Sequence, residues 1–194
     1  MLFQQKLVVI IECYLNNIIM KYMKLWCVGF NEFEKLAKNN RWHLEVPSNI
    51  AIISINNGKD AGTDTEYHIC EDDVNVLNLN FDDVDPMALG LSDDTETYTY
   101  ENKYAPSTFT TIEFFTNDMA KRAVKFIEDV IENNKLDGVD FYIHCSAGIS
   151  RSQAFVKYIK NVYYFMDWET NPNNPCLHPN GFVFQKLMQA YRSK

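Results

Sequence analysis

Short apolar runs alternate along this chain with amphipathic stretches of helical period, and this alternation limits the folds it can adopt. The runs are rich in Ile and Val and are bounded by Asn, Asp, Gly and Pro, as buried strands are. We predict strands at residues 24–30, 49–55, 74–81 and 139–144. We predict helices at residues 32–38, with Asn31 as cap, from Thr116 or Asn117 to about Asn133, and at 151–165 and 182–191. In one domain-sized chain, this order favours an α/β fold with a mainly parallel central sheet flanked by helices.

Two stretches do not follow the alternation. Residues 88–111 are polar, rich in Thr, Tyr and acids, and have no helical period. Within them, Thr95–Tyr100 alternates Tyr with Thr or Glu, which favours a strand or a small hairpin. Residues 170–180 are rich in Pro and Asn and are predicted to be loop.

Residues 1–23 are interpreted as an N-terminal extension. Their apolar run is too short to span a bilayer and lacks the small-residue cleavage site of a secretory signal. The extension is either a docked extra helix or a segment ahead of a start at Met20 or Met23. The domain is therefore expected to occupy residues 24–194, with an acidic insertion at about 88–111.

The charge of the chain is strongly uneven. Its net charge is −8, and the segment from Asp60 to Asp118 holds fifteen acids against one Lys, a balance of −14. A chain of this sign is a poor partner for nucleic acid or for an anionic membrane, so neither is expected as a partner.

The cysteines favour a reducing compartment. There are five of them, an odd number, widely scattered and without a C-x-x-C pair, which argues against a disulfide framework and against a zinc knuckle. We therefore expect free thiols and a cytoplasmic protein.

The segment after the last predicted strand combines the groups that hold an oxyanion. Residues 144–152 (HCSAGISRS) leave a strand and open a helix, so the backbone N–H groups of the turn lie at the positive end of the helix dipole. That field lowers the pKa of a thiol, so Cys145 is predicted to be a thiolate and a nucleophile for phosphorus. Arg151 is predicted to fork two hydrogen bonds to a phosphate, and Gly148 to permit the tight curvature.

This segment resembles the His-Cys-x5-Arg-Ser signature of the dual-specificity branch of the protein tyrosine phosphatase superfamily. The resemblance covers roughly residues 24–192. It runs through NIAIISI, VLNLNFDDVD, FTNDMAKRAVKFIEDVI, YIHCSAGISRSQA and HPNGFVFQKL, which look like the compact phosphatases of bacteria and their phages.

The resemblance implies a role for each residue of the loop. Cys145 would attack phosphorus and form a phosphocysteine intermediate. Ser152 would donate a hydrogen bond to the sulfur, and His144 would orient the loop and help to keep the thiolate ionised. The phosphate oxygens would be held by the Arg151 side chain and by the N–H groups of Ser146, Ala147, Gly148, Ile149, Ser150 and Arg151. No metal and no cofactor are implied.

The family also uses an Asp as general acid, just after the strand that precedes the long helix. Counting along VLNLNFDD indicates Asp83, with Asp82 and Asp85 as neighbours better explained as loop acids. The insertion makes the interval from this Asp to the cysteine longer than the resemblance implies. Asp93, Asp94 and Asp118 therefore remain alternatives.

The implied activity is hydrolysis of phosphotyrosine, with phosphoserine and phosphothreonine as further substrates, in a phosphoprotein or phosphopeptide. One alternative is an RNA 5′-triphosphatase of the same branch, which the −14 segment disfavours. Another is a phosphate-binding module without turnover, which would be expected to lack Cys145 or Arg151. The resemblance disfavours phosphoinositides, because lipid phosphatases of this superfamily carry Lys in the loop, whereas Ser146, Ile149 and Ser150 are neutral. An acidic rim around the site would favour phosphosites flanked by Lys or Arg.

Overall fold

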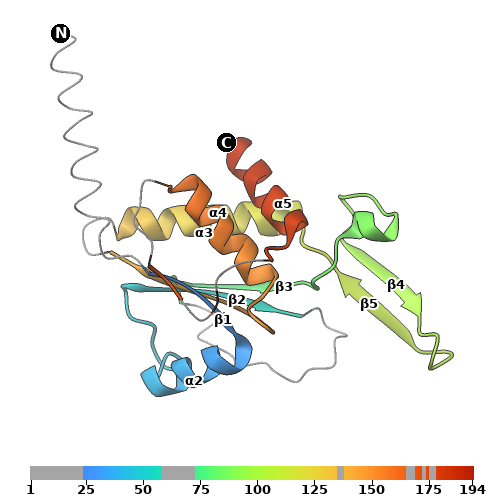
Figure 1. The fold of residues 1–194 in the computed structure, drawn as a ribbon, viewed down its shortest axis with the longest axis horizontal. Helices are drawn as coiled ribbons and strands as arrows, with labels where there is room; N and C mark the ends of the chain where they lie inside the picture. The colour runs from blue at the N-terminus through green and yellow to red at the C-terminus, as the bar shows by residue number, and fades with distance from the viewer. Residues whose placement is uncertain (1–23, 58–72, 135–137, 165–168, 172–173, 175–177) are drawn as a thin grey trace, which may run out of the picture.

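The computed structural model describes residues 24–57, 73–134, 138–164, 169–171, 174 and 178–194. Within them a five-stranded, all-parallel sheet has the order β3-β2-β6-β1-β7 (Figure 1). The strands are β1 (Lys24–Gly29), β2 (Ile50–Asn56), β3 (Val76–Asn80), β6 (Asp140–Cys145) and β7 (Glu169–Thr170). The predicted α/β class with a mainly parallel central sheet is confirmed.

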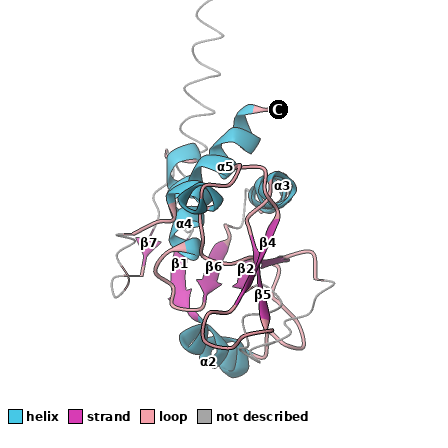
Figure 2. Ribbon diagram, turned by 90° about the vertical axis from the view of Figure 1, so that its right-hand side faces the viewer, coloured by secondary structure: helices cyan, strands magenta, loops and turns pink. Residues whose placement is uncertain are grey.

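Helices cover both faces of this sheet. One face carries α2 (Phe30–Asn40), and the other carries α3 (Asn117–Asn133), α4 (Arg151–Val162) and α5 (Gly181–Arg192) (Figure 2). The side chains of α3 that point inward are the predicted stripe Ala120, Ala123, Val124, Ile127, Val130 and Ile131. This arrangement encloses the central strands between two layers, which is why their sequences are apolar on both faces.

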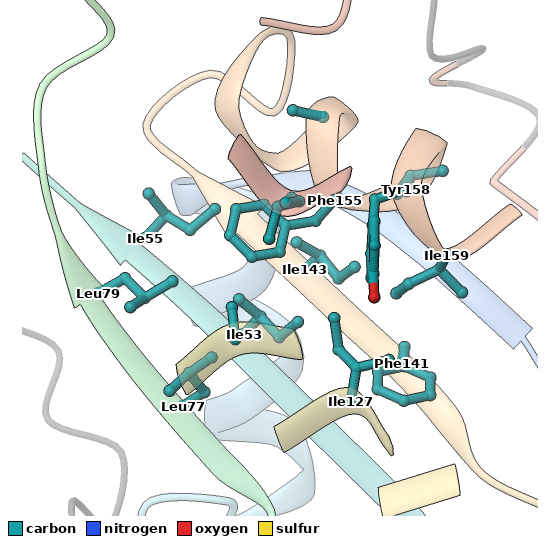
Figure 3. Packing of buried hydrophobic residues seen from close by; sticks show 14 of the residues in the cluster. Ile53, Ile55, Leu77, Leu79, Ile127, Phe141, Ile143, Phe155, Tyr158 and Ile159 are labelled. Carbon is teal, nitrogen blue, oxygen red and sulfur yellow. The ribbon is translucent and has the colours of Figure 1, made fainter. Parts of the chain in front are cut away.

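Alternation along the strands divides the core into two clusters. On the α3–α5 face, Ile53 and Ile55 of β2 pack with Phe155 of α4 (Figure 3). On the α2 face, Ile52 packs with Phe33. Because successive residues of a strand point to opposite faces, the last two residues of β6, His144 and Cys145, belong to different layers. The two side chains therefore have different surroundings.

The main differences from the predicted elements lie at element ends. Helix α2 begins at Phe30, and its N-cap is Gly29 with no side-chain cap, so the prediction that Asn31 caps it is wrong. The backbone N–H of Phe30 instead donates to Ser146 O at 3.1 Å, so a loop carbonyl takes the place of a cap. Helix α4 ends at Val162, before the predicted Phe165. Strand β7, only two residues long, was not predicted.

The polar insertion contains a hairpin that projects from the body of the domain (Figure 1). A short 3-10 helix, η2 (Pro86–Leu89), leads to strands β4 (Thr97–Glu101) and β5 (Phe109–Glu113), which pair antiparallel. The predicted strand at Thr95–Tyr100 is confirmed as β4, and it forms a hairpin with β5, which was not predicted. Its β4 side chains are all exposed, which explains why the stretch has no core-facing apolar pattern.

Some predictions fall outside the described residues, namely the interpretation of residues 1–23 and the state of Cys13, Cys70 and Cys176. Among the helices that are described, none has the length and apolar character needed to span a bilayer.

Candidate active site

The loop between β6 and α4 turns alternate carbonyls outward. Ser146 O accepts from Phe30 N at 3.1 Å, Gly148 O from Asn174 Nδ2 at 2.7 Å, and Ser150 O from Asn180 N at 3.1 Å. With these carbonyls held on the outside, N–H groups of the loop are directed toward its centre. The loop therefore forms a cradle of donors around Cys145, at the N-terminus of α4.

Gly148 has the backbone conformation that the sequence predicted. Its φ is +70°, and a Cβ placed on it would lie 2.6 Å from both Gly29 N and Val28 C. Both a positive φ and contact with the end of β1 therefore require glycine at this position. This contact holds the loop against β1.

Cys145 lies at the floor of the cradle and is 2% exposed. Its Sγ is 3.2 Å from Ser152 Oγ. Burial by itself raises the pKa of this thiol. Hydrogen bonds from the Ser152 hydroxyl and backbone, the charge of Arg151 and a backbone hydrogen bond from Gly148 outweigh burial, so the pKa lies below its ordinary value. The direction of this shift is the one that the sequence predicted.

A second buried thiol, Cys27 of β1, lies on the other side of Ser152. Its Sγ is 3.1 Å from Ser152 Oγ and 3.2 Å from Gly148 O. The sequence predicted only a free thiol at this position. The pairing of Gly29 with Cys145 in the sheet brings Cys27 here, and that pairing cannot be read from local sequence.

Arg151 is 4% exposed and connects the loop to the ends of β2 and β3. One guanidinium nitrogen donates to Phe81 O at 2.6 Å and Asn56 O at 3.2 Å. The other donates to Asn57 Oδ1 at 2.7 Å and to Ser146 Oγ at 3.0 Å. Nε is buried and has no hydrogen-bond partner among the described residues. The side chain is thus held in place by its two outer nitrogens.

His144 occupies the opposite face of the sheet from Cys145. Its ring stacks on Phe33 at 4.0 Å between centroids, and neither ring nitrogen has a hydrogen-bond partner within the described part of the chain. Burial, followed by the charge of Arg151, lowers its pKa to about 3. The ring is therefore neutral at physiological pH, and the prediction that it helps to keep the thiolate ionised is wrong. His144 instead packs against α2, through the ring of Phe33.

Asp83 is the carboxylate that meets the loop. Its Oδ1 accepts from Ser150 Oγ and from Asn180 Nδ2, both at 2.8 Å. Asp82 instead exchanges hydrogen bonds with Glu113 at the base of the hairpin, where its N–H donates at 2.7 Å and its carboxylate accepts at 2.9 Å.

The other candidate acids have structural surroundings. Asp85 caps η2 by accepting from Met87 N at 2.9 Å. Asp93, Asp94 and Asp118 line a separate cleft of about 470 Å³, whose lining includes no residue of the loop. Asp83 therefore contacts the loop directly, through the Ser150 hydroxyl.

Several amides support the site and were not predicted as part of it. Asn57 bonds to Arg151, Asn180 connects Asp83 to α5, and Asn174 reaches both Gly148 O and Cys27 O. Gln153 donates to Gly148 O at 3.3 Å and to Asn174 Oδ1 at 3.0 Å. Asn57 follows the end of a strand, and Asn180 precedes the start of a helix. These positions are the only indication in the local sequence that either residue belongs to the site.

No protein-family model matches the chain, and no curated protein sequence matches it. What the site can do therefore follows from its own geometry. A thiolate-favouring cysteine, a cradle of N–H donors, a buried guanidinium and a carboxyl group lie at the carboxyl edge of a parallel sheet, where ligands of α/β folds bind. Such an arrangement suits the binding of a tetrahedral oxyanion in front of a cysteine sulfur.

Proposed function

We propose that this protein is a cysteine-dependent phosphatase of the protein tyrosine phosphatase superfamily, acting on phosphotyrosine and also on phosphoserine and phosphothreonine in proteins. The observation that carries the proposal is the buried Cys145 sulfur inside a loop whose carbonyls of Ser146, Gly148 and Ser150 are tied outward. Such a loop binds an anion through its own backbone and leaves a nucleophile beneath it.

In the first step, the phosphoryl group lies in the cradle with its oxygens on the loop N–H groups and on Arg151. The Cys145 thiolate forms a bond to phosphorus while the bond from phosphorus to the substrate oxygen breaks. Asp83, held at the rim by Ser150 and Asn180, gives its proton to that oxygen, and the alcohol leaves. The N–H groups stabilise the charge that the equatorial oxygens carry.

In the second step, water attacks phosphorus and the S–P bond breaks. The Asp83 carboxylate takes a proton from that water, which returns the acid to its starting state. The Cys145 sulfur leaves as a thiolate, which the Ser152 hydroxyl at 3.2 Å stabilises by donating a hydrogen bond. Inorganic phosphate is then released.

We expect the purified chain to hydrolyse p-nitrophenyl phosphate in the presence of EDTA, and vanadate to inhibit it. The loop and Arg151 supply the charge stabilisation, so no added metal is needed. Release of nitrophenolate and of inorganic phosphate should be measured together. If no aryl phosphate is hydrolysed while phosphate still binds, as measured by calorimetry, the protein is a phosphate-binding module and the enzyme assignment fails.

We expect Asp83→Asn to separate good from poor leaving groups. The amide still accepts from Ser150 and Asn180, so the loop geometry persists, but the amide has no proton to give. Hydrolysis of phenyl phosphate should fall by about 10²-fold or more, and that of p-nitrophenyl phosphate by roughly tenfold or less. Asp93→Asn, which removes an equal charge from the other cleft, is the control. Equal losses on both substrates would mean that Asp83 is not the acid.

A further inference from the structure

A cleft of about 410 Å³ opens beside the phosphate-binding loop. Its walls come from the segment that contains Asp83, from η2, from Ser150 of the loop and from the start of α5. Asp83 and Ser150 are hydrogen-bonded to each other, so one wall of the cleft is the rim of the proposed active site. Residues that neighbour a phosphorylated side chain in the cradle therefore have this cleft within reach.

The charge of the cleft has one sign. Two carboxylates, Asp83 and Asp85, line it, and its lining includes no Lys, Arg or His. The remaining polar lining, which includes Ser150 and Gln185, is uncharged. Asp83 accepts from Ser150 and Asn180, and Asp85 accepts from Met87 N through Oδ1. Asp85 is the carboxylate of the cleft that the proposed reaction does not use.

The cleft also has apolar surface. Met87 of η2 is 63% exposed and lines it together with Phe182 of α5. A carboxylate beside apolar surface suits an amphipathic cation, because Lys and Arg carry a charged head on an aliphatic stem. An acidic side chain would bring like charges together and is disfavoured.

We propose that this cleft binds the side chain of an Arg or Lys close to the phosphorylated residue of the substrate, with Asp85 as the specificity-determining carboxylate. The proposal rests on the phosphatase function and defines its substrates as basic phosphosites. It narrows the acidity of the segment from Asp60 to Asp118 to a single cleft and a single carboxylate. The aliphatic stem of the bound residue lies against Met87 and Phe182, and its charged head reaches Asp85.

The test measures binding, so it does not depend on turnover. Fluorescent phosphotyrosine peptides carry one Arg at −2, −1, +1 or +2, and each is matched by a peptide with citrulline, the uncharged isostere of arginine. Their dissociation constants are measured with the Cys145→Ser variant by fluorescence anisotropy. We expect Arg at one or two positions to tighten binding by about tenfold over citrulline. Replacing that Arg by Glu should weaken binding.

The double variant Asp85→Asn, Cys145→Ser tests whether the preference for Arg over citrulline comes from the cleft. Asn caps a helix as well as Asp does, so η2 is retained and the charge is lost. We expect the ratio of the citrulline to the Arg dissociation constant to fall to near one. Asp93→Asn in the same background is the matched control and should keep the ratio.

The outcomes separate the two proposals. If the peptides are hydrolysed by wild-type protein but bind without regard to Arg at any position, the cleft proposal is overturned and the phosphatase stands. A preference that survives Asp85→Asn also overturns it. If the Arg preference and its loss are seen but nothing is hydrolysed, the cleft proposal is upheld for a binding module and the phosphatase assignment fails.

Discussion

Cys145→Ser should abolish hydrolysis of p-nitrophenyl phosphate, lowering the rate by on the order of 10⁴-fold or more. A serine hydroxyl at this position has no lowered pKa comparable to that of the thiol, so it is not ionised and does not attack phosphorus. The loop carbonyls remain tied outward in the variant, so phosphate and vanadate should still bind. Steady-state hydrolysis and isothermal calorimetry with vanadate measure the two properties.

Cys27→Ser is the matched control for this variant. Cys27 is also buried, and its sulfur lies as near to Ser152 Oγ as that of Cys145 does. The proposed mechanism forms no bond to the Cys27 sulfur, so its replacement should keep most of the activity. If Cys145→Ser retained activity while Cys27→Ser lost it, the nucleophile would be misassigned.

Arg151→Lys should lower kcat/KM for aryl phosphates by roughly 10²–10³-fold. The guanidinium makes four hydrogen bonds to acceptors at the ends of β2 and β3 and on the loop, and we expect its buried Nε to donate to the anion. A lysine ammonium keeps the charge but cannot span those acceptors and still present a donor inward. The affinity for vanadate should fall with kcat/KM.

The control is Arg122→Lys, the same exchange on the exposed face of α3. The melting temperature of each variant distinguishes a functional loss from an unfolded protein. If Arg151→Lys destabilised the fold but left kcat/KM of the folded fraction intact, Arg151 would serve as a structural tie and the proposed anion contact would be wrong.

Sequence periodicity was enough to predict the regular elements of the fold. The α3 stripe matches its buried face residue for residue, because a helix packed on a sheet must hide one face and only the 3.6-residue period does so. The loop was equally predictable, since Gly148, Cys145 and Arg151 must stand at set intervals between a strand and a helix. Strand β7 was not predictable, because two residues carry no period.

The surroundings of the loop depend on pairings that lie far apart in sequence. Cys27 reaches Ser152 because β1 pairs with β6, and Asn57 reaches Arg151 because β2 does. In its local sequence Cys27 looks like any buried strand residue, and Asn57 looks like any turn residue. The protonation of His144 depended on which face of β6 it occupies and on the ring of Phe33 that covers it there. Charge state follows from burial, and burial is a property of the whole fold.

Two hydrogen bonds between Asp82 and Glu113 join the two ends of the segment that contains the hairpin. The chain leaves the body of the domain at Asp82 and returns at Glu113, beside the same residue. Asp83 directly follows Asp82 in the sequence. Because these hydrogen bonds join the two ends of the hairpin segment, the length of that segment does not determine the position of Asp83. The long interval in sequence between Asp83 and Cys145 is taken up by a hairpin that projects from the body of the domain, and Asp83 still contacts the loop that follows Cys145, through Ser150.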